Sequence, residues 1–167
     1  MRRQKGFSLI ELLIVVAIIL IIAGIAIPNL LRAKIAANEA AAVSNLHTIF
    51  TAETAYFAAG WSNPGALGFS NTLPDLGDSG GCTPPKANSA CQIDNVLANA
   101  TTAATPKQGY FYTYVAVPNG AFNIAFSVQA DPVTRGSTGN RSFFTDQSGV
   151  IHQNPSQAAS ASDAALQ

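Results

Sequence analysis

The distribution of apolar and polar residues sets one long segment apart from the rest of the chain. Residues 7 to 27 read FSLIELLIVVAIILIIAGIAI and contain one ionisable side chain, Glu11. A helix of this length rises about 31 Å, enough to cross the roughly 30 Å hydrocarbon core of a bilayer. We therefore predict a membrane-spanning helix over residues 7–28.

The pattern changes after this segment, although residues 29–59 still favour a helix. Apolar side chains now recur at helical spacing on one stripe, which indicates an amphipathic helix that packs on a globular head. The stripe comprises Ile35, Ala42, Leu46, Ile49 and Phe57. We expect the polar residues Arg32, Lys34, Asn38, Glu39, Asn45 and Glu53 to lie elsewhere, on the surface. Gly60 is expected to end the helix, and Pro64 and Gly65 to prevent its resumption.

Two residues weaken the helix near the end of the apolar run. Pro28 lacks a backbone donor, and its ring clashes with the carbonyl four residues back, which belongs to Gly24. Gly24 itself has a low helix propensity. We therefore predict a kink and a flexible point over residues 24–28.

Residues 60–108 are rich in proline and glycine and are predicted to form a long connecting loop. We expect short turns there, with one helical turn at 92–99. Cys82 and Cys91 lie in this stretch. If the region is exported, the expected pairing is a disulfide that closes a short loop. A metal site would need more ligands than two cysteines without Cys-x-x-Cys spacing, so no metal is predicted.

Strand signals dominate residues 109–154. The run YFYTYVAV places Tyr110, Tyr112 and Tyr114 on one face, and Pro-Asn-Gly at 118–120 predicts a hairpin turn. The next run is expected to place Phe122, Ile124, Phe126 and Val128 on one face. With RSFFTD and VIHQN, three or four antiparallel strands would pack on the helix from Ile35 onward, giving an α+β fold. Residues 155–167 are expected to be a flexible tail.

The charges indicate orientation and exclude one class of partner. Nine basic and nine acidic side chains balance in the full chain, and three of the basic ones lie in residues 1–6. The excess of cations before the apolar run favours a cytoplasmic amino end and export of the rest. The remaining cations are scattered, so no nucleic-acid binding is predicted.

Catalytic signals are weak. The sequence has two histidines and contains no GxSxG, phosphate-loop or HExxH motif. His152, Ser148 and Asp146 fall within one predicted hairpin, which does not supply an oxyanion hole. Asp131 and Asp146 are interpreted as turn residues rather than calcium ligands. We expect no enzyme activity, no catalytic residues and no cofactor.

The segment KGFSLIELLIVVAIILIIAGIAIPNLLRAK resembles the amino terminus of type IV prepilins and type II secretion pseudopilins. Its specific part is Gly6-Phe7-Ser8-Leu9-Ile10-Glu11 followed by the apolar run. The resemblance implies that residues 1–6 are a leader, that a prepilin peptidase cleaves between Gly6 and Phe7, and that the same enzyme methylates the Phe7 amine. It also implies that Glu11 pairs with that amine in a helical filament of identical subunits.

The family resemblance leads to a first function and an alternative. The first is a type IV pilus subunit, inserted in the inner membrane as a precursor and assembled outside the cell for adhesion, motility or DNA uptake. The alternative is a periplasmic pseudopilin. Either would work with a pilus or secretion assembly machinery. A third reading is a secreted or anchored monomeric binding domain, produced by cleavage after Ala26 at Gly24-Ile25-Ala26.

Overall fold

The computed structural model describes residues 7–61 and 67–166. The leader with Gly6, and the predicted helix breakers Pro64 and Gly65, lie outside these ranges. The chain divides into two compact units, Met1–Lys34 and Ile35–Gln167. Helix α1, Leu9–Ala59, contributes to both and is helical through Pro28.

The described part of the first unit is the apolar half of α1. It provides the one helix, among the described residues, that is long and apolar enough to cross a membrane, and none of its most apolar window is buried. An apolar helix with no covered face is suited to lipid or to other apolar helices rather than to water.

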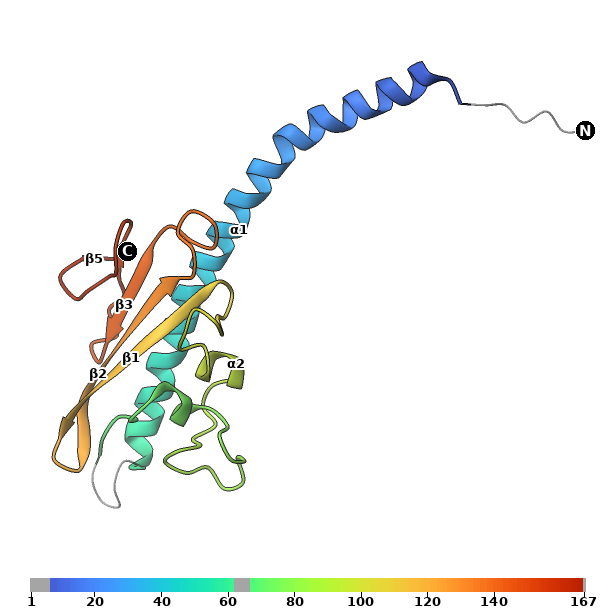
Figure 1. The fold of residues 1–167 in the computed structure, drawn as a ribbon. Coiled ribbons are helices and arrows are strands. Elements are labelled where there is room, and N and C mark those ends of the chain that lie inside the picture. The colour runs from blue at the N-terminus through green and yellow to red at the C-terminus, as the bar shows by residue number, and fades with distance from the viewer. Residues whose placement is uncertain (1–6, 62–66, 167) are drawn as a thin grey trace, which may run out of the picture. The chain divides into compact units, whose positions relative to one another are not determined.

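The second unit combines the remainder of α1 with an antiparallel sheet, as Figure 1 shows. Its five strands follow one another in chain order, so each pairs with its neighbour in sequence. They are β1 (Tyr110–Asn119), β2 (Phe122–Pro132), β3 (Ser142–Asp146), β4 (His152–Asn154) and β5 (Ala164–Ala165). The predicted α+β class, with a long helix and a small antiparallel sheet, is confirmed.

The core lies between the sheet and the buried face of α1. Leu46, Ile49 and Tyr56 from the helix are fully buried there. The strands contribute Tyr110, Tyr112, Phe126, Val128 and Phe143. The predicted helix stripe is therefore right in outline, although Phe57 is only partly buried.

The connection between helix and sheet contains two short helices. These are η1, a 3-10 helix at Leu73–Leu76, and α2, Asn95–Ala98, which falls inside the predicted helical turn at 92–99. Each buries apolar side chains in the core, including Leu73, Leu76 and Leu97. Helix α1 ends at Ala59, and Gly60 follows with φ of 66°, the left-handed conformation that glycine adopts at a helix end.

The β1–β2 hairpin differs from the prediction in its turn and in one face. Asn119 still pairs with Phe122, so the two-residue turn is Gly120-Ala121, with φ of 67° at Gly120. A register shift beside Pro118 leaves Ile124 as an extra residue in β2. Such a bulge reverses the alternation. Ile124 is consequently exposed while Asn123, Phe126 and Val128 are buried.

Two further expectations need correction. The sheet has five strands because the segment expected to be a tail, 155–167, contributes β5, which pairs with β4. Ala159 is buried and Leu166 packs against the core. On the helix, Glu39, Asn45 and Glu53 are buried rather than on the surface, since each has hydrogen-bonding partners from the head.

Candidate functional site

The first candidate site is the beginning of the apolar helix. Phe7 is 80% exposed. The backbone N–H of Ser8 donates to Oε2 of Glu11 over 2.9 Å. A carboxylate in this position satisfies a backbone donor at the helix start and interacts favourably with the helix dipole. Glu11 thus caps its own helix while its side chain stays exposed.

The apolar surface that follows Glu11 is uncovered. Its large side chains are at least 45% exposed, from Leu9 to Leu31. Removing such a surface from water is strongly favourable, at roughly 25 cal/mol per Å² of apolar area. A contiguous patch of this size marks a site that a membrane or other protein chains must cover.

Gly24 and Pro28 both lie inside the continuous helix α1. A Cβ atom built at Gly24 would meet nothing within 4 Å, so packing inside the chain does not require glycine there. Its remaining effect is on the helix itself, where glycine costs up to about 1 kcal/mol relative to alanine. The predicted kink over residues 24–28 stays a prediction.

A buried carboxylate joins α1 to the connecting loop and the sheet. Glu53 is fully buried and accepts from the Ser70 backbone N–H over 3.0 Å and from the Tyr114 hydroxyl over 2.7 Å. The Ser70 hydroxyl donates to it as well. Burial raises the pKa of Glu53 above its ordinary value, and these donors oppose that rise. Glu53 therefore ties three separate elements together.

A second buried carboxylate holds the other end of this helix segment. Glu39 accepts from the backbone N–H groups of Asn140 and Arg141, over 2.8 and 3.2 Å, and from the Arg141 guanidinium over 2.8 Å. Burial raises the pKa of Glu39, but the donors outweigh it and hold the pKa below its ordinary value. Midway between the two carboxylates, Asn45 donates to the Tyr112 hydroxyl over 2.8 Å.

These polar anchors were missed because charged residues on a helix are usually solvated. The sequence does contain a signal for them. Glu39 and Glu53 are three positions before Ala42 and four after Ile49, so both lie on the same stripe as the apolar residues. A charge on the buried stripe requires a partner in the head.

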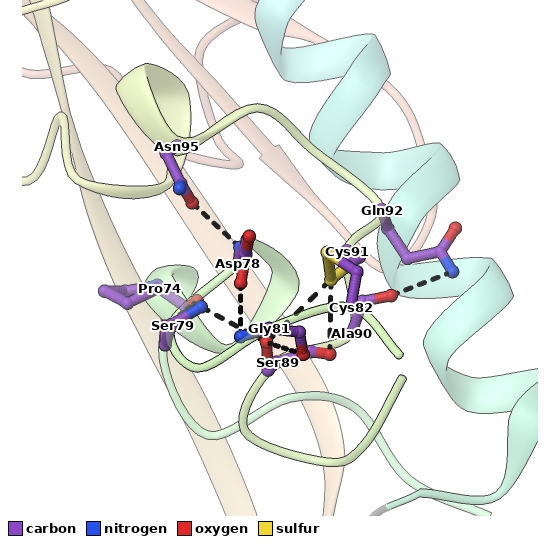
Figure 2. The surroundings of a disulfide bond; sticks show 10 residues. All are labelled: Pro74, Asp78, Ser79, Gly81, Cys82, Ser89, Ala90, Cys91, Gln92 and Asn95. Carbon is purple, nitrogen blue, oxygen red and sulfur yellow. Dashed lines mark hydrogen bonds between the residues drawn. A yellow bond between two sulfur atoms is a disulfide. The ribbon is translucent and has the colours of Figure 1, made fainter. Parts of the chain in front are cut away.

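The predicted disulfide between Cys82 and Cys91 is present. Figure 2 shows the polar contacts around it. Asp78 accepts from the Gly81 N–H over 2.6 Å, and its own N–H donates to Asn95 of α2 over 2.8 Å. The Cys91 N–H donates to the Gly77 carbonyl over 3.1 Å. The bridge thus fixes the base of an exposed loop, residues 81–88, against η1 and α2.

The loop also contacts the long helix. The Tyr56 hydroxyl donates to the Ala87 carbonyl over 2.9 Å. Burial raises the pKa of Tyr56 to about 12, so the hydroxyl remains a donor at neutral pH. Asp78 lies near the two sulfur atoms, but these are bonded to each other and are not available as thiolate ligands.

The residues considered for catalysis or calcium binding have structural partners. The Nδ1 atom of His152 lies 2.7 Å from the Asp163 carbonyl. Asp146 accepts from the Ser148 backbone N–H over 2.8 Å, which is a turn contact. Asp131 accepts from Ser142 and Gln129. These contacts account for each side chain within the fold.

Comparison with known proteins gives three matches. The prokaryotic N-terminal methylation motif matches residues 1–27. PilA4 of Thermus thermophilus, a type IV wide pilus major component, is 36% identical over 124 residues, covering 70% of this chain and 93% of that protein. The type IV major pilin protein PilA of Myxococcus xanthus is 36% identical over 105 residues, covering 61% of this chain.

The two relatives differ in how much of them the chain spans. It covers nearly the whole Thermus protein but 46% of the Myxococcus protein. The search of solved structures found no match.

Proposed function

Because this chain belongs to the type IV pilin family, we propose that it is a structural subunit of a type IV pilus rather than an enzyme. The observation that carries the proposal is the uncovered apolar half of α1 with Glu11 at its start. One surface can serve two states: the precursor places it in lipid, and the filament buries it against the same segment of neighbouring subunits. Contacts of this repeating kind, which do not close into a ring, build open filaments.

Removal of the leader would create a positively charged amine at Phe7 that can pair with the Glu11 carboxylate. We propose that a prepilin peptidase cuts between Gly6 and Phe7 and methylates the new Phe7 amine. An acid inside a bilayer or a filament core is costly unless it is paired, so the cationic amine of a neighbour is a suitable partner. The exposure of Glu11 supports this role, since its carboxylate is accessible from outside the chain.

The proposed route begins at the inner membrane and ends outside the cell. The cationic leader stays on the cytoplasmic side, and the head with its disulfide is exported, where such bonds persist. A pilus assembly machinery then extracts the processed subunits into the filament. Fibre length under the electron microscope tests the alternative, because a pseudopilin gives short, membrane-retained assemblies.

The experiment compares surface fibres from cells that produce the natural chain, Glu11→Gln or Glu11→Val. Glutamine keeps an oxygen that can accept from the Ser8 N–H but removes the charge, so it separates pairing from helix capping. We expect both variants to be inserted and cleaved normally and to yield at least about tenfold fewer fibres. Normal fibres from Glu11→Gln would contradict charge pairing, and absence of long fibres from the natural chain would contradict the pilus proposal.

A further inference from the structure

The loop between β2 and β3 is hydrogen-bonded to α1 near the start of the second unit. The Asn38 side chain donates to the Thr138 carbonyl over 2.8 Å. Next to it, Glu39 accepts from the backbone N–H groups of Asn140 and Arg141 and from the Arg141 guanidinium. We call this set of contacts, between Asn38 and Glu39 on the helix and residues 138–141 on the loop, the helix clasp.

The clasp is supported from behind by the sheet. The Tyr110 hydroxyl donates to the Arg141 carbonyl over 2.7 Å, and the Arg141 side chain also donates to Gln153 over 2.7 Å. Its guanidinium lies 5.4 Å from the centroid of the Phe143 ring. A Cβ atom added at Gly139 would overlap the Tyr110 side chain. The loop therefore packs tightly against side chains of the sheet, and this packing resists displacement of residues 138–141 when the helix is pulled.

The helix before the clasp lacks comparable support. Every side chain from Gly24 to Lys34 is exposed, and the first buried residue after them is Ile35. Gly24 and Pro28 further reduce the stability of this stretch, through glycine's entropy cost and the missing proline donor. Helix stability in proteins comes mostly from packing of a buried face, so the head contributes least to this stretch, where Gly24 and Pro28 also weaken the helix itself.

We propose that the helix clasp is a mechanical stop, which prevents unwinding of α1 from entering the head when the filament is pulled. The inference rests on the proposed pilus function. Tension along the fibre unwinds residues 24–34 first, and the clasp prevents the unwinding from spreading into residues 35–44. Conversion from 1.5 Å to about 3.4 Å per residue over this stretch lengthens the chain by about 20 Å per subunit.

The position of the next polar contact between α1 and the head determines how much further the helix can unwind when the clasp is lost. It is Asn45, which donates to Tyr112 and to Gln108 over 2.8 and 3.0 Å. Without the clasp, unwinding can continue through residues 35–44, a further stretch of similar length. The reversible extension per subunit would then approximately double, to about 40 Å.

The test is single-fibre pulling on the natural chain, Glu39→Ala and the control Asn45→Ala. Glu39→Ala removes the clasp acceptor, whereas Asn45→Ala removes an attachment that lies behind the intact clasp. We expect about twofold greater extension from Glu39→Ala and no change from Asn45→Ala. Equal extension in all three fibres, or an equal increase in both variants, would overturn the proposal.

Hydrogen exchange tests the same claim without fibres, using the full-length protein in detergent micelles. We expect amides of residues 36–44 to exchange at least about tenfold faster in Glu39→Ala, with little change at residues 46–56. A uniform acceleration across the head would contradict a local stop. Glu39→Gln provides a milder variant, because its amide oxygen still accepts from Asn140. If the natural chain forms no fibres, the pilus proposal fails, whereas normal fibres with unchanged exchange in Glu39→Ala refute only the clasp.

Discussion

The Tyr114 hydroxyl donates to the fully buried carboxylate of Glu53 over 2.7 Å, linking β1 to α1 across the core. Ser70, from the connecting loop, donates to the same carboxylate. Glu53 therefore links the helix, the connecting loop and the sheet through hydrogen bonds to a single carboxylate. Breaking one of these bonds leaves a buried charge with fewer donors, which is more costly than losing a bond at the surface.

Tyr114→Phe is expected to lower the free energy of unfolding by about 1–3 kcal/mol at pH 7. Because burial raises the pKa of Glu53 above 4.5, its ionised form is penalised in the folded state. This penalty is relieved as the pH falls through the raised pKa towards 4.5. The hydroxyl of Tyr114 favours the ionised form, so the deficit of the variant should shrink over the same window.

Tyr112→Phe is the matched control for this titration. Its hydroxyl accepts from Asn45, which does not ionise. Urea unfolding of the full-length protein in detergent, at several pH values, should give a deficit for Tyr112→Phe that is nearly independent of pH. A pH-independent deficit for Tyr114→Phe would contradict the role assigned to Glu53.

Arg141→Met should also show a deficit that shrinks as the pH falls, but over a lower pH range, because the pKa of Glu39 is lowered whereas that of Glu53 is raised. The pKa of Glu39 is lowered by its donors, so Glu39 contributes stability above its ordinary value of 4.5 that is lost as the pH falls through the lowered pKa. Removing the guanidinium should cost about 1 kcal/mol at pH 7, since Arg141 is partly exposed and solvent screens the pair. Thermal unfolding from pH 7 to pH 3 should show this cost disappearing in acid.

Removing the disulfide with Cys82→Ser and Cys91→Ser together should destabilise the exported head. For a loop of nine residues' separation, the chain-entropy estimate is somewhat under about 3 kcal/mol. Reductant should lower the stability of the natural chain by a similar amount and leave the double variant unchanged. If reductant also destabilised the double variant, the loss of stability in the natural chain would not be due to the disulfide.

Gly139→Ala should destabilise the head by about 1–3 kcal/mol, because the added methyl group overlaps the side chain of Tyr110. Gly80→Ala is the control. A Cβ atom there meets only the end of the Lys86 side chain, at an ordinary contact distance of 3.6 Å. Equal unfolding temperatures for the two variants would contradict the tight packing behind the clasp.

The sequence predicts the elements with strong periodicity well. The apolar run and its amphipathic continuation specify α1, and the alternation from Tyr110 specifies β1, because a single pattern dictates each of them. The alternation could not reveal the bulge at Ile124. The bulge is defined by strand pairing, since Asn123 pairs with Pro118 and Ala125 with Val117 while Ile124 between them has no partner in β1.

The polar anchors and the last strand depend on contacts between distant residues. Glu39 meets residues about a hundred positions away, and β5 has only two residues, too few for a periodic signal. The amino-terminal site, in contrast, is specified by residues that are close together in the sequence. Gly6, Phe7 and Glu11 are recognisable from a short local motif, although their processing and pairing involve molecules beyond the single chain.

The mass and amino-terminal sequence of the mature protein, measured in parallel from sheared surface fibres and from membranes, test the central claim most directly. The account predicts that the chain in the fibres begins at a methylated Phe7 and that uncleaved precursor is confined to membranes. A soluble product beginning at Ile27 would place the cut after Ala26, remove Glu11 from the mature protein and contradict assembly through the apolar helix.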